Sequence, residues 1–280
     1  MQKTYTPLRY PGGKSKLYNY ICTFLNQYYE HPPVYAEAFA GGFGLGMSLL
    51  LQEKVNEVYI NDFDFCIYSF WKSITSPKCY YRFVRLVNDT PVDINNYLMQ
   101  KKIYKHPKRH SITEVGFATF FLNRCNRSGI LSANPIGGIE QTGNYRIDCR
   151  FNKERLLKLI ETIYNHRNQI HVTNLDAIAF LEQIDNRRTN VLFNLDPPYV
   201  SAGPTLYKNN FSEDDHIALS NRVHHLNNHW IMTYDNHDLI RDCYKDYLVR
   251  EYSIKYYLED KRDEVELIIY DNAFVNPPRL

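Results

Sequence analysis

The sequence predicts an α/β fold with a doubly wound, mostly parallel sheet, a terminal antiparallel hairpin and one inserted domain. Two observations predict it. Short apolar segments alternate with segments of helical periodicity, and a long basic stretch interrupts this alternation in the middle of the chain. Strands that alternate with helices are typical of a parallel sheet covered by helices on both faces. A chain of 280 residues has room for such a sheet and one sizeable insertion.

The first part of the chain predicts a helix followed by a β-α-β unit. Apolar side chains recur at three- and four-residue spacing from Leu17 to Tyr28, which is the period of a helix. Two short apolar runs, 34–39 and 58–60, predict strands, and the stretch 44–52 between them predicts a helix. A β-α-β unit of this kind is typical of a doubly wound sheet.

Further strands are predicted in the second half of the chain, at 170–173, 191–195 and 230–233. Each leads into a helix-like stretch, and one of these helices begins with a capping-box pattern from Ser212 to Asp215. The apolar stretches 253–257 and 265–270 flank the polar run 259–262 and predict a final antiparallel hairpin.

Charge divides the chain more clearly than its total suggests. The net charge is only +2, but residues 72–170 hold 17 Lys and Arg against 7 Asp and Glu, and the remainder has a net charge of −8. A basic segment of this size favours a polyanionic partner. We therefore assign 72–165 to an inserted domain, and 1–71 together with 166–280 to the core domain.

The insert predicts a helix that carries Phe117, Phe120 and Phe121, and then the polar loop 123–129. The period-two stretch 145–151 predicts one strand of a hairpin. Most basic side chains of a nucleic-acid-binding segment contact phosphate, whereas arginine can read guanine and asparagine can read adenine. The candidates for base contact are Asn123, Arg124, Asn126, Arg127 and Ser128, and Arg9 is a further candidate for contact with DNA.

The most specific pattern is Asn194-Leu195-Asp196-Pro197-Pro198-Tyr199, directly after an apolar strand. Consecutive prolines form a stiff turn whose carbonyl groups remain free to accept hydrogen bonds. Such a turn can hold an amino group between the Asp196 carboxylate and the Pro197 carbonyl, while Tyr199 offers a flat face to a heterocycle. Asp-Pro and Pro-Pro are also common in ordinary loops, so this pattern alone does not decide the function.

The second pattern, from Val34 to Gly46, is a strand that runs into a glycine-rich turn and then a helix. Glycines allow a nucleotide-like ligand to approach the backbone at the end of a strand. The spacing does not fit G-x-G-x-x-G, so the dinucleotide fingerprint fails. Asp62 follows Gly42 by 20 residues, at the end of the next strand, where an acid can accept hydrogen bonds from ribose hydroxyls. Together they predict a nucleoside-containing cofactor without a pyrophosphate.

The segment Arg9-Tyr10-Pro11-Gly12-Gly13-Lys14-Ser15 is similar to the end of a P-loop. Leu8 stands where a Walker A loop needs glycine and no apolar strand precedes the segment, so we reject ATP binding. A lysine at a helix start can still bind a carboxylate or a phosphate.

Metal binding and membrane insertion are not expected. His225 and His229 stand four residues apart but lack a third ligand, and the six cysteines include no Cys-x-x-Cys pair. The cysteines are expected to be reduced. The N-terminal residues lack the apolar core of a signal peptide, and no stretch approaches the length of a membrane span, so we expect a cytoplasmic protein.

In their order along the chain, these patterns resemble the DNA adenine-N6 methyltransferases of the Dam type. The segment 10–14 is similar to the N-terminal motif of that family, 37–42 to its cofactor loop, 174–176 to the motif near the cofactor adenine, and 196–199 to its catalytic motif. The insert lies where the family has its target-recognition domain, and 121–124 is similar to the start of the recognition hairpin.

The resemblance implies an S-adenosylmethionine-dependent methyltransferase fold and methyl transfer to the N6 amino group of a flipped adenine in duplex DNA. It implies catalytic roles for Asp196, Pro197 and Tyr199. It implies no metal, and the cofactor-binding residues that it implies are Tyr10, Lys14, Glu37, Gly41, Asp62, Asp176 and Asp196. Expected partners are double-stranded DNA and, in a restriction-modification pair, a cognate restriction endonuclease. The chain is expected to act as a monomer.

Other functions compete with this interpretation. A cytosine-5 methyltransferase needs a Pro-Cys nucleophile, and the chain contains no Pro-Cys dipeptide. A non-enzymatic DNA-binding module leaves the glycine-rich turn and the Asp-Pro-Pro-Tyr motif without a purpose. Methyltransferases that act on RNA or on a protein amide bind the amino group with a related motif, and this activity remains the alternative.

Overall fold

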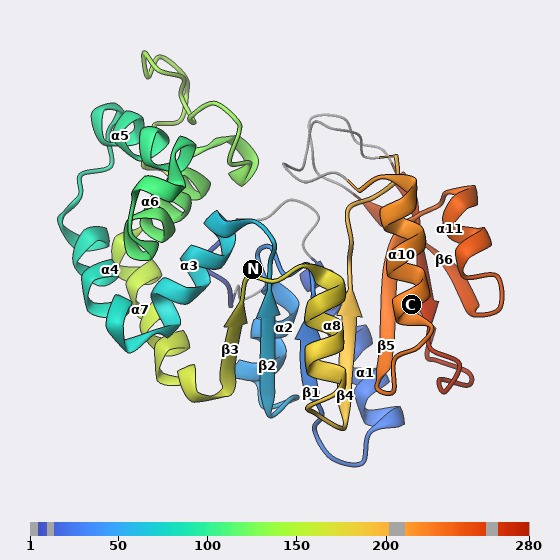
Figure 1. Ribbon diagram of the computed structural model, residues 1–280. Helices are drawn as coiled ribbons and strands as arrows, with labels where there is room; N and C mark the ends of the chain where they lie inside the picture. The colour runs from blue at the N-terminus through green and yellow to red at the C-terminus, as the bar shows by residue number, and fades with distance from the viewer. Residues whose placement is uncertain (1–4, 10–13, 202–210, 256–262, 280) are drawn as a thin grey trace.

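The computed structural model describes residues 5–9, 14–201, 211–255 and 263–279. Within this part of the chain, seven strands form one sheet in the order β3-β2-β1-β4-β5-β7-β6 (Figure 1). The strands are β1 (Val34–Glu37), β2 (Glu57–Asn61), β3 (Ile170–Thr173), β4 (Val191–Leu195), β5 (His229–Asp235), β6 (Leu248–Lys255) and β7 (Asp263–Tyr270). The predicted α/β fold is confirmed.

The order of strands determines where a ligand can bind. Strands β3, β2, β1, β4 and β5 pair in parallel, and β7 pairs antiparallel with both β5 and β6. The chain runs from β1 outward to β2 and β3 and then returns to β4 on the other side of β1. This reversal between β1 and β4 is a topological switch point, the usual ligand site of an open α/β sheet. The described parts of β6 and β7 confirm the terminal hairpin, whereas the predicted turn at 259–262 lies outside the described residues.

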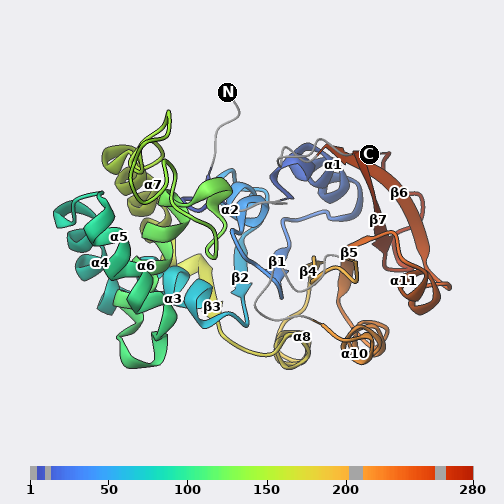
Figure 2. The same cartoon turned by 90° about the horizontal axis from the view of Figure 1, so that it is seen from above.

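Successive side chains along a strand point to opposite faces of the sheet, and each face carries its own cluster of buried side chains. Tyr35 and Leu192 belong to one cluster, together with side chains of α1 and α2, whereas Ala36 and Phe193 belong to the other, with α8 and α10. Figure 2 shows these two pairs of helices on opposite faces of the sheet. In the described part of the core domain, the α-helices are α1 (Tyr18–Tyr28), α2 (Gly44–Leu51), α8 (Ala177–Asp185), α10 (Glu213–Val223) and α11 (Asp238–Cys243).

The predicted strands at 170–173 and 191–195 have the predicted bounds, because each is a short apolar run between polar residues. The predicted capping box is confirmed: the Ser212 hydroxyl accepts a hydrogen bond from the Asp215 amide, and the Asp215 carboxylate accepts one from the Ser212 amide. Strand β1 ends at Glu37, two residues before the predicted end. The backbone turns after Glu37 to form the glycine-rich loop.

The inserted segment is largely helical and shares a core with one face of the sheet. Trp71 and the rings of Phe70, Phe83, Phe117 and Phe120 belong to the same buried cluster as Tyr35. Helix α3 runs across the predicted boundary between residues 71 and 72 and contacts α6. Figures 1 and 2 show the insert beyond the β3 edge of the sheet. Its helices are α3 (Phe65–Thr75), α4 (Pro77–Asp89), α5 (Ile94–Lys105), α6 (Ile112–Cys125) and α7 (Lys153–Asn165), and short 3-10 turns include Arg127–Gly129.

The strand predicted over 145–151 is wrong, because these residues form turns. Only Ile147 and Phe151 are buried in this stretch. The Gln141 side chain donates to the carbonyls of Ile136 and Gly138 and accepts from the Ile147 amide, so it satisfies backbone groups that a strand partner would otherwise pair. The hairpin expected in the insert is reduced to a single antiparallel bridge between 126 and 135 among the described residues.

All six cysteines are free, as expected. Within the described ranges, no helix combines the length and the apolar character that a membrane crossing requires.

Candidate active site

A buried asparagine ties together the carboxyl ends of three neighbouring strands. Asn61, the last residue of β2, donates to the carbonyl of Ala38 after β1 and to the carbonyl of Leu175 after β3. Its side-chain oxygen accepts from the Leu175 amide and the Thr173 hydroxyl. Each polar atom of the side chain is therefore used, and the loops that follow β1, β2 and β3 are held at one edge of the sheet.

Asp62 and the glycine-rich turn meet at this edge. The Asp62 carboxylate accepts hydrogen bonds from the amides of Gly41 at 2.8 Å and Asp64 at 2.9 Å. Gly41 has a φ of +47°, a conformation that favours glycine, and its carbonyl accepts from the Trp71 indole. Burial raises the pKa of Asp62 to about 7, although the two amide donors act in the opposite direction. The side chain therefore ionises near neutral pH.

Glu37 lies at the end of β1 as a buried carboxyl group. The Tyr35 hydroxyl donates to it at 2.7 Å. Burial raises the pKa of Glu37 to about 8, while the hydrogen bonds from Tyr35 and Asn194 act in the opposite direction. At pH 7 the side chain is therefore mostly protonated and can itself donate a hydrogen bond.

Asp196 follows β4 and lies in a network of charged side chains. The Thr233 hydroxyl donates to its Oδ1 at 2.7 Å, and the Lys14 Nζ lies 3.3 Å from the same oxygen. Burial raises the pKa of Asp196 above its usual value, against the effect of the Lys14 charge. Lys14 also contacts Glu266 at 3.0 Å and donates to the Tyr199 hydroxyl at 2.6 Å. Burial favours neutral Lys14, but the two carboxylates outweigh this effect and raise its pKa.

The loop after Asp196 has a second anchor. The carboxylate of Asp235, at the end of β5, accepts hydrogen bonds from the amides of Val200 at 3.1 Å and Ser201 at 2.7 Å. Lys14 therefore holds the loop at Tyr199, and Asp235 holds it one residue further on. An acid, a proline turn and an aromatic ring are thus fixed beside the switch point, in an arrangement that can bind a planar group with an amino substituent.

A comparison with known protein families decides between the candidate functions. The sequence model of the D12 class N6 adenine-specific DNA methyltransferases matches residues 10–261. The chain belongs to this family. No curated protein matches it.

Membership in the D12 class confirms the resemblance that the sequence suggested. This D12 methyltransferase is an S-adenosylmethionine-dependent enzyme that is specific for adenine in DNA. The family therefore favours DNA over the alternatives of RNA and a protein amide. The match includes the whole insert, the glycine-rich turn and the Asp-Pro-Pro-Tyr motif.

Two of the predicted base-reading residues of this D12 methyltransferase are buried. Asn123 accepts from the Arg9 amide and donates to the carbonyls of Arg9 and Gly129. Asn126 is fully buried, and its side-chain amide donates to the carbonyls at 130 and 131. Base contact by these two side chains therefore does not fit the structure. They instead fasten the N-terminal segment and the following loop to α6.

Arg9 and Arg124 also have partners inside the protein. A guanidinium nitrogen of Arg9 donates to the Asn126 carbonyl at 3.0 Å. Arg124 donates through Nε to the Arg150 carbonyl at 2.8 Å and lies 3.5 Å from the Pro7 carbonyl. Gly129 completes this contact, since a Cβ atom there would stand 2.3 Å from the Arg9 carbonyl oxygen. Pro7 and Arg9 are therefore closely packed against the insert.

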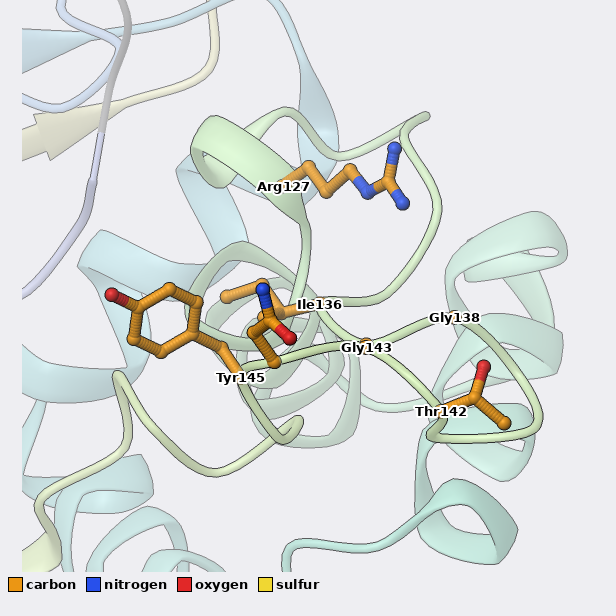
Figure 3. A pocket seen from close by; sticks show the side chains of 8 residues that line it. Arg127, Ile136, Gly138, Thr142, Gly143 and Tyr145 are labelled. Carbon is orange, nitrogen blue, oxygen red and sulfur yellow. The ribbon is translucent and has the colours of Figure 1, made fainter.

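Arg127 and Ser128 are exposed, unlike their neighbours in the predicted loop. Arg127 lies beside an open hollow of about 450 Å³ whose lining also includes Thr142, Asn144 and Tyr145. Figure 3 shows that Arg127 and Tyr145 extend from different parts of the long loop between α6 and α7, residues 126–152, and Tyr145 is 68% exposed. In Figure 1 this loop extends toward the same end of the molecule as the carboxyl ends of the parallel strands.

The remaining predicted positions divide into three groups. Asp176 caps α8 by accepting hydrogen bonds from the amides at 178 and 179. Tyr10 lies outside the described residues. His225 and His229 have separate hydrogen-bond partners, the Asn221 carbonyl and the Asp271 carboxylate. Among the described residues, no group of three or more His, Cys, Asp or Glu side chains could hold a metal ion.

Sequence reasoning missed the side chains that surround Asp196 from the last strands. Glu266 and Thr233 contact the Asp196–Lys14 pair, and Tyr252 donates to Glu266. One signal was present in the sequence. The period of a strand places Glu266 on the same face as Ile268 and Tyr270, and an acid next to buried apolar positions needs a cationic or hydrogen-bonding partner.

Proposed function

We propose that this enzyme transfers a methyl group to the N6 atom of an adenine that is flipped out of duplex DNA, with Asp196, Pro197 and Tyr199 as the residues that hold the base. The observation that carries the proposal is the position of Asp196. It stands at the carboxyl end of β4, beside the switch point, and it is bonded to Thr233 and paired with Lys14. Its side chain is nevertheless 29% exposed, so a ligand can reach it.

The chemistry of the amino group explains why these residues are needed. The lone pair of an exocyclic adenine nitrogen is conjugated with the ring, so the nitrogen is a poor nucleophile. Two acceptors, the Asp196 carboxylate and the Pro197 carbonyl, would bind its two hydrogens and favour the pyramidal form, in which the lone pair is available. Acceptors that are fixed before the reaction stabilise the charge that develops on the nitrogen.

Base flipping follows from the depth of this site. An adenine within a duplex cannot reach a carboxylate at the edge of the sheet, so the base must leave the stack, at a cost of a few kcal/mol. The Tyr199 ring would recover part of that cost by stacking on the base. Lys14 donates a hydrogen bond to the Tyr199 hydroxyl, and the rings of Tyr199 and Tyr234 lie 6.3 Å apart, so both the hydroxyl and the ring of Tyr199 have contacts that hold them in place.

The residues at the ends of β1 and β2 fit an adenosyl cofactor. The two oxygens of Asp62 each accept one amide hydrogen and retain lone pairs for ribose hydroxyls. Gly41 has no side chain to obstruct the approach. Glu37 is the last residue of β1, and Asp176 follows the end of β3 by three residues, at the start of α8. When bound, S-adenosylmethionine supplies a methyl group on a positively charged sulfur. Lys14 would meet the cofactor carboxylate only by exchanging one of its three present partners.

The ionisation of Asp62 predicts how cofactor affinity depends on pH. The carboxylate form accepts hydrogen bonds from the ribose, and the pKa of Asp62 is about 7, so the binding form is lost as the pH falls through 7. Affinity for S-adenosylmethionine should be about tenfold weaker at pH 6 than at pH 8. Titration calorimetry at several pH values measures this change, and Asp62→Asn should bind weakly without this dependence. Equal affinity of the wild-type enzyme at pH 6 and pH 8 would contradict the role of Asp62.

The insert is proposed to hold the duplex. Its excess of basic residues supplies affinity through phosphate contacts, which do not depend on base sequence. The exposed Arg127 and Ser128, beside the hollow that Tyr145 also lines, remain our candidates for contact with bases. One chain contains the acid, the glycine-rich turn and the basic insert, which supports a monomer as the active unit.

The two arginines of the loop provide a matched test of DNA contact. Arg127→Ala should weaken binding to the preferred duplex by about 1–3 kcal/mol, and its effect on mismatched duplexes should be smaller if the side chain reads a base. Arg124→Ala should act mainly through lost contacts to the carbonyls of Arg150 and Pro7, and should lower the melting temperature instead. Fluorescence anisotropy and thermal unfolding measure the two effects. An unchanged affinity in Arg127→Ala would exclude that residue from the interface.

A further inference from the structure

Lys14 has two carboxylate partners, and they differ in their access to solvent. The Glu266 side chain is 1% exposed and the Lys14 side chain 6%, whereas Asp196 is 29% exposed. The order from the interior outward is therefore Glu266, Lys14 and Asp196. Only Asp196, the outermost of the three, is open to a substrate.

The inner carboxylate is itself held in place. The hydroxyl of Tyr252 on β6 donates to Glu266 Oε2, the same oxygen that contacts Lys14. Strand β7 lies between β5 and β6, and Glu266 pairs in register with Asp235 and with Tyr252. Asp235 anchors the loop after Tyr199, so two residues paired in register, Asp235 and Glu266, both act on the loop that contains the catalytic motif.

Lys14 links Glu266 to the loop that contains Asp196 and Tyr199. An ammonium group has three N–H donors, and three acceptors lie within 3.3 Å of Nζ: the Tyr199 hydroxyl, Glu266 and Asp196. The Nζ also lies 5.2 Å from the centre of the Tyr199 ring. The angle of the ring that would stack on the base therefore depends on where Lys14 is held.

We propose that Glu266, supported by Tyr252, is a positioning residue for methyl transfer: it retains the Lys14 ammonium between Asp196 and Tyr199 and keeps it from pairing with Asp196 alone. The inference rests on the proposed roles of Asp196 and Tyr199. Glu266 does not touch the substrate and acts only through Lys14.

The charge of the network explains why a second carboxylate is useful. Two carboxylates share one ammonium, so the group has a net charge of −1 and Asp196 remains a strong acceptor. Without Glu266 the ammonium would neutralise Asp196 and compete with the adenine amino group for its oxygens. Among the described residues, other titratable groups that face this network are Tyr35 and Glu37 of β1, Tyr199, Tyr234 of β5, and Tyr252 of β6, which contacts Glu266.

Glu266→Gln tests the proposal, because it removes the charge and keeps the shape of the side chain. We expect the single-turnover rate of methyl transfer to a duplex to fall about 10- to 100-fold, since small displacements of reacting groups have effects of this size. The KM values for DNA and S-adenosylmethionine should change by less than about threefold. The acid limb of the rate profile should move to lower pH, because Glu266 raises the pKa of Asp196. Glu266→Asp should recover part of the rate.

Two further variants keep the test decisive. Glu251→Gln, an exposed glutamate of β6 paired with Arg241, is the matched control and should retain the wild-type rate. Tyr252→Phe should also lower the rate of methyl transfer, but by less than Glu266→Gln. If circular dichroism shows that Glu266→Gln is unfolded, Tyr252→Phe is the variant that tests the proposal. A wild-type rate and pH profile in folded Glu266→Gln, or in Tyr252→Phe where that variant decides, would overturn the proposal. A lower rate with an unmoved acid limb would also overturn it, because it indicates a structural role alone.

Failure of this inference is distinct from failure of the proposed function. If Asp196→Ala is inactive while Glu266→Gln is fully active, only the role of Glu266 is refuted. If Asp196→Ala retains activity, the proposed binding of the amino group by Asp196 is refuted. The proposed role of Glu266 then also fails, because it depends on Asp196.

Discussion

Asp196→Ala is expected to abolish methyl transfer while the affinity for S-adenosylmethionine stays within a few-fold of wild type. The carboxylate is the proposed acceptor for one hydrogen of the adenine amino group, and an electrostatic contact of this kind contributes about 10²- to 10³-fold to a rate. The loss also leaves the buried Lys14 with Glu266 as its only carboxylate partner among the described residues. A rate at least about 10²- to 10³-fold below wild type is therefore expected.

The measurement is transfer of a tritiated methyl group to an adenine-containing duplex, combined with calorimetric titration of the cofactor. Asp242→Ala is a suitable control, because Asp242 is an exposed acid on α11, away from the strand ends that form the site. Retained activity in Asp196→Ala would refute the mechanism. Loss of activity together with loss of the fold would instead be visible in the thermal unfolding of the same sample.

Tyr199→Ala is also expected to lower methyl transfer strongly. Removal of an aromatic platform costs about 1–3 kcal/mol for each stacked base, which corresponds to a decrease of about 5- to 150-fold in transfer to DNA. Tyr199→Phe keeps the ring and loses only the hydroxyl that accepts from Lys14. It should therefore decrease the rate by about two- to tenfold, the range of a single hydrogen bond.

The fluorescence of 2-aminopurine at the target position reports flipping of the base directly. Wild type and Tyr199→Phe should raise this fluorescence. Tyr199→Ala should raise it less, because the flipped base then lacks an aromatic ring on which to stack. If the alanine variant methylates and flips as well as the phenylalanine variant, stacking on Tyr199 is not part of the mechanism.

The core domain could be predicted because its signals are local. The strands at 170–173 and 191–195 are short apolar runs with polar ends, and the capping box at Ser212 needs only four consecutive residues. The Asp-Pro-Pro-Tyr motif and the glycine-rich turn were recognisable for the same reason. Each places its chemistry directly after a strand, and parallel strands bring their carboxyl ends to one edge of the sheet.

The insert could not be predicted equally well, because its polar residues serve long-range contacts. Asn123 looked like part of a solvated loop, but it belongs to α6 and bonds the backbone of Arg9, 114 residues away. The alternation of 145–151 suggested a strand, yet the Gln141 side chain takes the place of a strand partner. Composition does not reveal which polar side chains face the backbone and which face solvent.

The surroundings of Lys14 show the same limit within the site. A lysine at a helix start suggested a contact with an anion, and the structure pairs it with Asp196 and with Glu266, 252 residues away in sequence. Only the fold brings the terminal hairpin to the N-terminal motif. The acidic remainder of the chain thus contributes carboxylates to one site, while the basic excess belongs to the insert.

Methyl transfer from S-adenosylmethionine to adenine N6 in duplex DNA can be tested by chemical analysis of the methylated product. Purified enzyme is incubated with tritiated S-adenosylmethionine and duplex DNA, RNA or protein, and labelled DNA is digested to nucleosides. The label is expected in DNA as N6-methyladenine, and no label is expected in DNA that was incubated with the Asp196→Ala variant. Label in RNA or protein without label in DNA, or label on a base other than adenine, would contradict it.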